Sequence, residues 1–303
     1  MTIVLGICTY RRPVELRKLL LALPKLKHCN DLTVVVADND PGHEGLQVCK
    51  TLPEDYPFTV TAMSQTSTGI SAVRNAVAAK ALSFEPEMVA FLDDDEWPEP
   101  QWLSELLRVQ KQFDADVVGG PTRPEFPPHA HASLHDNPYY GADLNLPDGS
   151  ACQLQAGGNF LIKASVLQRY TPNFFDEAFS HSGSEDLAFF TRLARDGYAM
   201  RWAAQAIVHE PVPDSRLAPD WLQQRVINIH NSRVRVMQQL EPGLAASIIR
   251  LVKTAALASV AFVLSLSSLA LPAYRQRAEL LRWKLTGKLT AHLGKVTTRG
   301  ETY

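Results

Sequence analysis

The chain has 303 residues, of which 46% are hydrophobic and 20% are charged. These are values of a globular, core-forming protein, and they exclude a disordered chain. The net charge of −2 conceals an asymmetry, because residues 244–303 hold nine Lys and Arg against two acids and the first 243 residues are therefore −9. Such a division predicts an acidic catalytic body with a basic tail that faces an anionic surface, and no nucleic-acid partner.

Four cysteines are scattered through the chain without the spacing of a metal site: Cys8, Cys29, Cys49 and Cys152. This usage predicts reduced thiols in a cytosolic protein. The N-terminus has no basic stretch followed by an apolar one, so we expect no signal peptide.

The first hundred residues alternate between apolar runs and amphipathic segments. Strands are predicted at residues 3–8, 32–37, 58–63 and 88–92, and helices at 14–23, 45–52 and 71–82. The continuous apolar runs predict strands buried on both faces, which is typical of a parallel sheet wrapped by helices. In such sheets ligands gather at the carboxyl ends of the strands.

The pattern changes past residue 104. Helices are predicted at 103–113, 184–196 and 219–240, and strands at 116–120, 160–163 and 200–209. Residues 121–150 have no periodicity and predict a long functional or mobile loop. We therefore predict an α/β catalytic domain over 1–240 and a helical, membrane-associating tail over 241–303.

Four acidic residues, Asp93 to Glu96, follow the apolar run that ends at Leu92. Adjacent carboxylates repel one another, and a hard divalent cation such as Mg²⁺ or Mn²⁺ would relieve that repulsion while sharing its shell with substrate phosphates. The alternative interpretation is a solvated acidic turn. Two other predicted strands end in distinctive polar residues, Thr9 to Arg12 and Asp38 to Asp40. Neither GxxxxGK[ST] nor GxGxxG is present.

Six segments occur in the order and at the spacing of the family 2 inverting glycosyltransferases with the GT-A fold, which the chain resembles over roughly residues 2–240. They are Ile3 to Pro13, Val34 to Asp40 (VVVADND), Thr68 to Val77 (TGISAVRNAV), Phe91 to Leu103 (FLDDDEWPEPQWL), Gly157 to Leu167 (GGNFLIKASVL) and Phe174 to Gly197. The segment His209 to Ile227 is similar to bacterial enzymes of surface-polysaccharide synthesis, of the succinoglycan type. The resemblance implies a Rossmann-like, mostly parallel sheet.

The resemblance also implies a nucleotide-sugar donor, most simply a UDP-sugar, and a divalent cation. The residues expected at the donor are Thr9, Tyr10, Arg12, Asp38, Arg74, Asn75, Asp93, Asp94, Gly157 and Gly158. Asp95 is expected to hold the metal, together with Asp93 and with His209, for which a structural role is the alternative. Arg74 has an alternative role as the ion-pair partner of Asp93 or Asp95.

The catalytic base implied by the resemblance is Asp186, with Glu185 as the second candidate and helix capping as the alternative for both. This base would take a proton from the acceptor, a lipid-linked or surface glycan. Polymerising relatives carry QxxRW beside several membrane spans, whereas this chain has Glu279-Leu280-Leu281-Arg282-Trp283 and one apolar segment. We therefore expect transfer of a single sugar.

The apolar segment covers residues 254–272, which carry no charge and have basic residues on both sides. Basic flanks at both ends favour a membrane-surface or re-entrant helix over a single span, and a buried helix is the alternative. We expect a cytoplasmic protein that is peripheral at the inner face of the cell membrane. Competing functions are a nucleotidyltransferase and a non-catalytic nucleotide-sugar-binding membrane protein; the set of Asp93, Asp95 and Asp186 disfavours the latter.

Overall fold

The computed structural model describes residues 2–27, 31–180 and 183–297 and divides into two compact units. The first contains residues 2–180 and Glu185–Pro213, and the second contains residues 214–297 with 183–184. The division between the two units falls after Pro213, whereas the sequence predicts a domain boundary after residue 240, which is the end of the next long helix. The predicted boundary stays a prediction.

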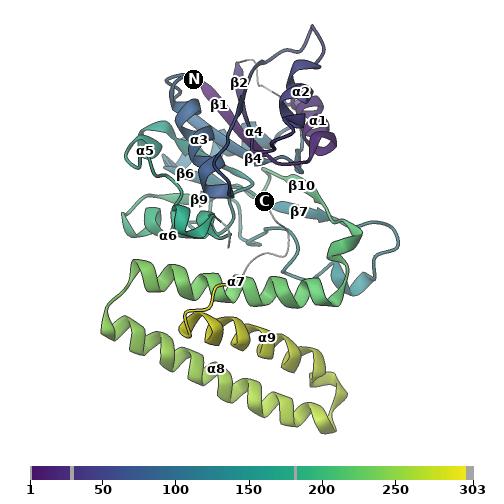
Figure 1. Cartoon of the computed structure of the whole chain (residues 1–303), viewed down its shortest axis with the longest axis vertical. Coiled ribbons are helices and arrows are strands. Elements are labelled where there is room, and N and C mark those ends of the chain that lie inside the picture. Colours follow the sequence, from purple (N-terminus) through teal and green to yellow (C-terminus); the bar gives the residue numbers. More distant parts are fainter. Residues whose placement is uncertain (1, 28–30, 181–182, 298–303) are drawn as a thin grey trace. The chain divides into compact units, whose positions relative to one another are not determined.

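A seven-stranded sheet organises the first unit (Figure 1), in the order β3-β2-β1-β4-β8-β6-β9. Its strands are β1 (Ile3–Thr9), β2 (Leu32–Asp38), β3 (Thr59–Ser64), β4 (Met88–Asp93), β6 (Val117–Gly119), β8 (Phe160–Lys163) and β9 (Met200–Trp202). All neighbours are parallel except β8, which runs antiparallel to both β4 and β6. The sheet is thus mostly parallel, as the apolar runs predicted, and β1 and β4 carry their polar ends to one edge.

Helices cover both faces of this sheet, and each face has its own core. The helices are α1 (Pro13–Ala22), α2 (Glu44–Lys50), α3 (Ile70–Leu82), α4 (Trp102–Phe113), α5 (Ala164–Gln168) and α6 (Glu185–Arg195). Side chains of α1, α2 and α4 pack with Leu5, Ile7 and Val34 on one face. Those of α3, α5 and α6 pack with Val4, Val35 and Phe91 on the other. Because side chains alternate along a strand, one apolar run supplies both cores.

A three-stranded sheet, in the order β5-β10-β7, stands beside the strand ends. Its strands are β5 (Trp97–Pro98), β7 (Thr122–Glu125) and β10 (Val208–Pro211). In this region the structure differs from two of the sequence predictions. Residues 121–150, predicted without regular structure, contribute β7 and the short 3₁₀ turn Ala132–Leu134. The predicted strand 200–209 is two strands, because a turn in which the N–H of Ala206 donates to Ala203 O (3.0 Å) leads the chain from one sheet to the other.

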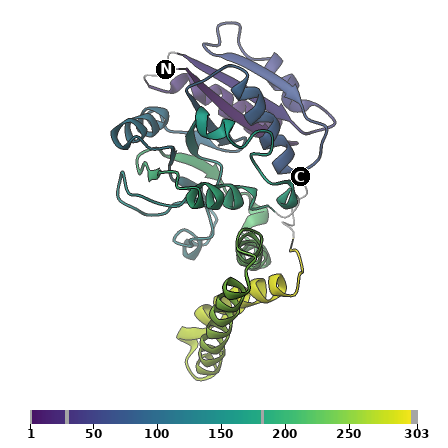
Figure 2. The same ribbon diagram turned by 90° about the vertical axis from the view of Figure 1, so that its left-hand side faces the viewer.

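The second unit consists mainly of α7 (Pro219–Leu240), α8 (Leu244–Ala270) and α9 (Arg275–His292). Short 3₁₀ turns precede α7 (Asp214–Arg216) and join α8 to α9 (Pro272–Tyr274). Within this unit α9 contacts both α7 and α8, and α8 and α9 lie side by side in two views (Figures 1 and 2). Of the residues described, α8 is the helix long and apolar enough to cross a membrane.

Three of the four cysteines lie within the part of the chain that the structure describes, and all three are free thiols. Burial raises the pKa of Cys8 above its ordinary value, and burial raises the pKa of Cys49 and of Cys152 to about 11. Such thiols are protonated at neutral pH and therefore poorly reactive. Cys29 lies outside the described residues.

Candidate active site

The four acids that follow β4 point in different directions and meet different partners. The N–H of Glu96 donates to Asp93 O (3.1 Å), so the chain turns sharply at the strand end. Asp94 and Glu96 are buried, whereas the Asp93 side chain is 42% exposed. The turn therefore presents Asp93 to the strand-end crevice while it holds Asp94 and Glu96 against the protein.

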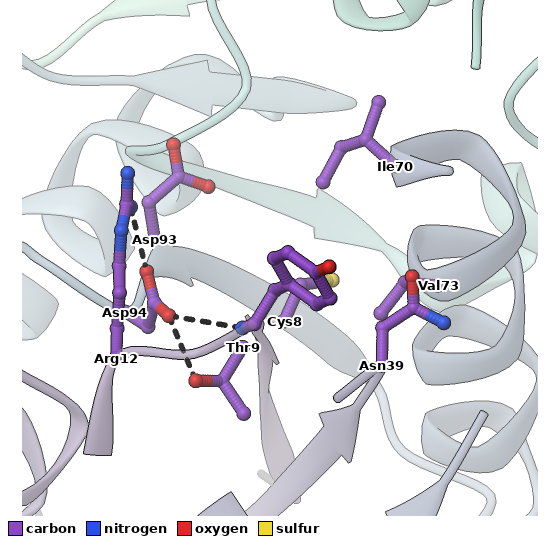
Figure 3. Close-up of a pocket in the computed structure, with 9 residues that line it drawn as sticks. Cys8, Thr9, Arg12, Asn39, Ile70, Val73, Asp93 and Asp94 are labelled. Carbon is purple, nitrogen blue, oxygen red and sulfur yellow. Dashed lines mark hydrogen bonds and ion pairs between the residues drawn. The ribbon is translucent and has the colours of Figure 1, made fainter. Parts of the chain in front are cut away.

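Thr9, the last residue of β1, and Arg12, three residues further on, both contact the buried Asp94 (Figure 3). Thr9 Oγ1 and the Arg12 guanidinium donate to Asp94 at 2.8 and 3.1 Å, and the same guanidinium donates to Asp95 at 2.8 Å. The Tyr10 N–H completes this set at 3.4 Å from Asp94. The two predicted strand-end motifs thus meet because β1 and β4 are adjacent parallel strands.

Burial dominates the electrostatics of these carboxyls. It raises the pKa of Asp94 to about 6 and the pKa of Asp95 to about 7, although the nearby charge of Arg12 acts in the opposite direction. Burial also raises the pKa of Glu96 well above its ordinary value, with the charges of Asp93 and Glu210 adding to the effect. A cation bound at this cluster would lower all of these pKa values and favour the ionised forms.

Arg74, in the first turns of α3, connects the acid cluster to the opposite side of the crevice. Its guanidinium donates to Asp93 (2.8 Å) and to Gly157 O (2.8 Å), and it forms an ion pair with Glu185 (3.4 Å). The residue is 5% exposed. Burial acts to lower the pKa of Arg74, but the charges of Asp93 and Glu185 raise it above its ordinary value. The predicted ion pair with Asp93 is present.

The two candidate bases at the start of α6 have different surroundings. Asp186 is partly exposed and accepts hydrogen bonds from the N–H groups of Gly157 (3.1 Å) and Leu187 (2.7 Å). Glu185 is 3% exposed and faces Arg74. Of the two, Asp186 is the carboxylate that a substrate hydroxyl can approach, and Glu185 is a counter-ion of a buried guanidinium.

Gly157 and Gly158, the pair before β8, lie so close to other side chains of the protein that neither can carry a side chain of its own. A Cβ on Gly157 would lie 2.2 Å from Arg74 Nη1, and a Cβ on Gly158 would lie 2.5 Å from Glu96 Oε1. Neither position leaves room for a side chain unless Arg74 or Glu96 moves. The close approach of these glycines to a sugar stays a prediction.

Asp38 and Asn75, both predicted to face the nucleotide, have their polar atoms directed to the backbone. Asp38 is 1% exposed and accepts from the N–H groups of Asp40 (2.9 Å) and Leu46 (3.1 Å). The Asn75 side chain forms a pair of hydrogen bonds with the backbone of Phe175, at 2.7 and 2.9 Å. In this structure both side chains hold loops that border the crevice.

His209, on β10, has a carboxylate near each ring nitrogen. Nδ1 lies 2.6 Å from Glu125 Oε1 and Nε2 lies 3.2 Å from Glu99 Oε1, and the ring stacks on Trp97. The structure thus places His209 in the three-stranded sheet between two glutamates, whereas the metal ligands predicted with it, Asp93 and Asp95, contact Arg74 and Arg12.

Asn159 is a residue of the site's framework that the sequence reasoning did not single out. Its Oδ1 accepts from Trp102 Nε1 (2.7 Å), and its Nδ2 donates to the carbonyls of Pro121 (3.1 Å) and Ala206 (2.8 Å). It therefore joins α4, β8 and the segments that lead to β7 and β10. The feature of the sequence that could have indicated its importance is its position directly after Gly157 and Gly158, within the GGN segment.

Asp93 and Asp95 are the carboxylates of the cluster that were predicted to bind a divalent cation. Within the described ranges, no three His, Cys, Asp or Glu residues form a group that could hold a metal ion. The carboxylates of Asp93 and Asp95 nevertheless fit a hard cation such as Mg²⁺ or Mn²⁺, which needs one or two protein oxygens and completes its shell with phosphates and water. Burial is the main cause of the raised pKa of Asp95, and the negative charges of Glu210, Asp94 and Asp93 raise it further, which a bound cation would offset.

A mostly parallel sheet with carboxylates and guanidinium groups at its strand ends is typical of α/β enzymes, which have their ligand sites at that edge of the sheet. Residues 5–171 match the model of glycosyl transferase family 2. The chain is 31% identical over 247 residues to the succinoglycan biosynthesis protein ExoM of Rhizobium meliloti (strain 1021), covering 79% of this chain and 76% of that protein. The chain therefore belongs to glycosyl transferase family 2, and it is a glycosyltransferase.

Solved structures show the same fold. A mannosyltransferase of Pyrobaculum calidifontis, PcManGT, solved in complex with GDP-Man and Mn²⁺, matches with a TM-score of 0.65 at 18% identity over 97% of this chain and 87% of that one. TarS 1–349 of S. aureus, in complex with UDP-GlcNAc, matches with a TM-score of 0.54 at 14% identity over 97% and 93%. The fold is GT-A, as the six sequence segments implied.

Proposed function

We propose that the protein transfers a single sugar from a nucleotide sugar, most simply a UDP-sugar, to a lipid-linked or surface glycan acceptor with inversion and with the help of a divalent cation. One observation carries the proposal. Asp93 contacts Arg74, Arg74 contacts Gly157 O, and the Gly157 N–H contacts Asp186. The carboxylate assigned to the donor and the one assigned to the acceptor are thus connected through the Arg74 side chain and the Gly157 backbone.

At the donor side, Asp95 and Asp93 would hold the cation, which supplies Lewis-acid stabilisation of charge on the leaving diphosphate. Thr9, Tyr10 and Arg12 line a pocket beside Asp94 and Asn39. The planar Arg12 guanidinium, which here contacts Asp94 and Asp95, is of the type that binds phosphate oxygens with two hydrogen bonds. Asp38 and Asn75 support this pocket through the loops that they hold.

At the acceptor side, Asp186 would take the proton of the acceptor hydroxyl while that oxygen attacks the anomeric carbon from the face opposite the leaving group. A single displacement of this kind inverts the configuration. The hydrogen bonds from the N–H groups of Gly157 and Leu187 fix the orientation of the Asp186 carboxylate.

The similar proteins support this assignment. The matching protein of Rhizobium meliloti is named for succinoglycan biosynthesis, which supports a role in polysaccharide assembly. The two solved neighbours contain GDP-Man with Mn²⁺ and UDP-GlcNAc, which supports a nucleotide-sugar donor and a divalent cation. Membership of a glycosyltransferase family disfavours the nucleotidyltransferase and the non-catalytic binding protein. We extend the proposal to a location at the inner face of the cell membrane, on the basis of the apolar α8.

Calorimetric titration of UDP and GDP, with and without Mn²⁺, tests the donor assignment in the wild type and in Asp95→Ala. We expect Mn²⁺-dependent binding in the wild type and a loss of about tenfold or more in the variant, since a direct cation ligand is removed. The exposed Glu54 offers a matched control as Glu54→Ala. Mn²⁺-dependent affinity that is equal in wild type and Asp95→Ala would reject the assignment.

A further inference from the structure

The outer side of α8 is apolar and open to solvent. Val252, Val260, Phe262, Val263, Leu266 and Leu269 are between 52 and 81% exposed. Only 11% of the most apolar window of this helix is buried. A contiguous apolar surface of this length is rare on a soluble monomer and marks a site of protein or membrane contact.

The inner side of α8 is already occupied by α9. Thr254 and Ala261 are buried, and Thr254 Oγ1 lies 3.1 Å from Nε2 of His292, the last residue of α9. The 3₁₀ turn Pro272–Tyr274 joins the two helices at their other ends. The connecting turn at one end and the contact of the last residue of α9 with Thr254 at the other make α8 and α9 an antiparallel hairpin (Figures 1 and 2).

The second helix of the hairpin cannot follow α8 into a bilayer. It carries five basic residues, Arg275, Arg277, Arg282, Lys284 and Lys288, and each charge at the bilayer centre disfavours insertion roughly a hundredfold. It is also fixed to α7, because a Cβ on Gly287 would lie 2.3 Å from Ile227 O and Asn231 Nδ2 donates to Thr290 Oγ1 (3.0 Å). If α8 crossed the bilayer, α9 would have to leave both of its partners.

Charge identifies the occupant of the apolar surface. Lys253 precedes the uncharged stretch of α8, Arg275 and Arg277 follow it, and all three are exposed. Residues 244–303 have a net charge of +7. A second copy of the chain would bring two such basic sets together, whereas an anionic lipid surface offers hydrocarbon for the apolar side and phosphates for the basic flanks.

We propose that α7–α9 form a monotopic membrane-binding unit in which α8 lies in the plane of an anionic bilayer surface and does not cross it. The apolar side of α8 inserts among the acyl chains, the basic flanks contact lipid headgroups, and α9 stays on the aqueous side of α8. This inference specifies the proposed location and does not depend on the proposed reaction.

Flotation of the full chain with vesicles tests the contact. We expect binding to vesicles of phosphatidylcholine mixed with phosphatidylglycerol, weaker binding to phosphatidylcholine alone, and weakening with salt. Val263→Asp should reduce vesicle affinity about tenfold or more, because it places a charge in the inserted surface. Val14→Asp is the matched control, since Val14 on α1 is 59% exposed, as is Val263, and lies in the first unit.

Depth measurements distinguish a helix in the plane from one that spans. Single Trp substitutions at Val252, Val263 and Leu269 report quenching by lipids brominated near the headgroup or near the chain end, after subtraction of the wild-type signal. These positions extend over 17 residues, about 25 Å of helix, so a spanning α8 would place Val263 deeper than its neighbours. We expect the same shallow depth at all three.

Three results would overturn the proposal. One is graded depth, with Val263 deepest, which indicates a span. Another is equal vesicle binding by Val263→Asp and the wild type. The last is a wild type that does not bind vesicles and is a dimer by light scattering, while Val263→Asp is a monomer. That result would assign the apolar surface to contact with a second copy of the chain. UDP binding by Val263→Asp should equal that of the wild type, because the substitution lies outside the candidate active site. If the wild type itself bound no nucleotide, the proposed reaction would be rejected and the membrane inference would be unaffected.

Discussion

At the scale of single residues, Arg74 determines how the two halves of the crevice are held together. Its guanidinium contacts Asp93, the carbonyl of Gly157 and Glu185. The guanidinium carbon, Cζ, lies 5.7 Å from the centre of the Phe175 ring. A buried charge is tolerated when opposite charges and acceptors surround it, as they do here. Loss of Arg74 would leave Glu185 as a buried carboxylate that has lost its ion-pair partner.

Replacement of Arg74 tests this account. We expect Arg74→Met to lower the free energy of unfolding by about 3–5 kcal/mol, because a buried carboxylate loses its cation. Arg74→Met with Glu185→Gln should recover part of that loss, and Arg17→Met, at an exposed arginine of α1, should change little. Urea denaturation measures all four proteins. A double variant that is as unstable as Arg74→Met would contradict the pairing.

Replacement of Asp186 tests the base. Asp186→Asn keeps an oxygen that can accept from the Gly157 N–H but cannot take a proton. We expect turnover to fall by about 100- to 10,000-fold, while the affinity for UDP with Mn²⁺ is retained. Steady-state kinetics and calorimetry separate the two effects. Near-normal turnover in Asp186→Asn would show that another group accepts the proton.

The residues of the site that could be predicted are those at strand ends. Asp93 to Asp95 come at the end of an apolar run, so their position at the end of β4 could be predicted from the local pattern, and their role stays a prediction. Asn159 could not be singled out because its three partners lie 38 to 57 residues away. The partner of Asn75, Phe175, is likewise 100 residues distant, and residue type alone does not distinguish an amide that holds a loop from one that binds a ligand.

At the scale of elements, helices and parallel strands were predictable because their signals are local. The apolar runs of β1, β2 and β4 and the periodicity of α4 appear within a single window. The three-stranded sheet was not predictable, since its strands have two to four residues and pair across long separations. Trp97 on β5 pairs with His209 on β10, for example, and Thr122 on β7 pairs with Val208.

The close packing of α9 on α7 gives a prediction at this scale. Gly287 has no room for a side chain, because a Cβ would lie 2.3 Å from Ile227 O and 3.1 Å from the Asn231 backbone nitrogen. We expect Gly287→Ala to destabilise the second unit by about 1–3 kcal/mol, through forced separation of the two helices.

The control for Gly287 is Gly243, which precedes α8 with open space around it and an ordinary φ of −61°. Gly243→Ala should be neutral or slightly stabilising. Hydrogen exchange of the α9 amides measures the local effect in both variants. Equal protection of α9 in Gly287→Ala and the wild type would show that the two helices can separate without loss of stability.

At the scale of the whole molecule, the two units respond to acid with opposite signs. The folded pKa of Asp94 and of Asp95 is raised by burial, so these carboxyls bind protons more readily in the folded state. Their contribution stabilises the first unit at low pH and is lost as pH rises through about 6 to 7. A chelator is needed for this comparison, because a bound cation would favour the ionised carboxylates.

The second unit has the opposite dependence because of His230 on α7. Burial lowers the pKa of His230 to about 3, and the charges of Arg233, Lys284 and Lys288 act in the same direction. Its folded pKa lies below its unfolded value, so the unfolded state binds the proton more readily. The associated stability is present above the unfolded pKa of about 6.5 and is lost as pH falls toward the folded value.

We therefore expect the second unit to lose about 1 kcal/mol between about pH 7.5 and about pH 5.5 through His230 alone. His230→Gln, which cannot titrate in this range, should remove that part of the dependence while the dependence that arises from Asp94 and Asp95 remains. Thermal unfolding of both proteins at the two pH values, with chelator present, measures the difference. A shift of equal size in His230→Gln and the wild type would mean that protonation of His230 is not coupled to folding. The positive charges around it would then be too distant to disfavour its protonated form.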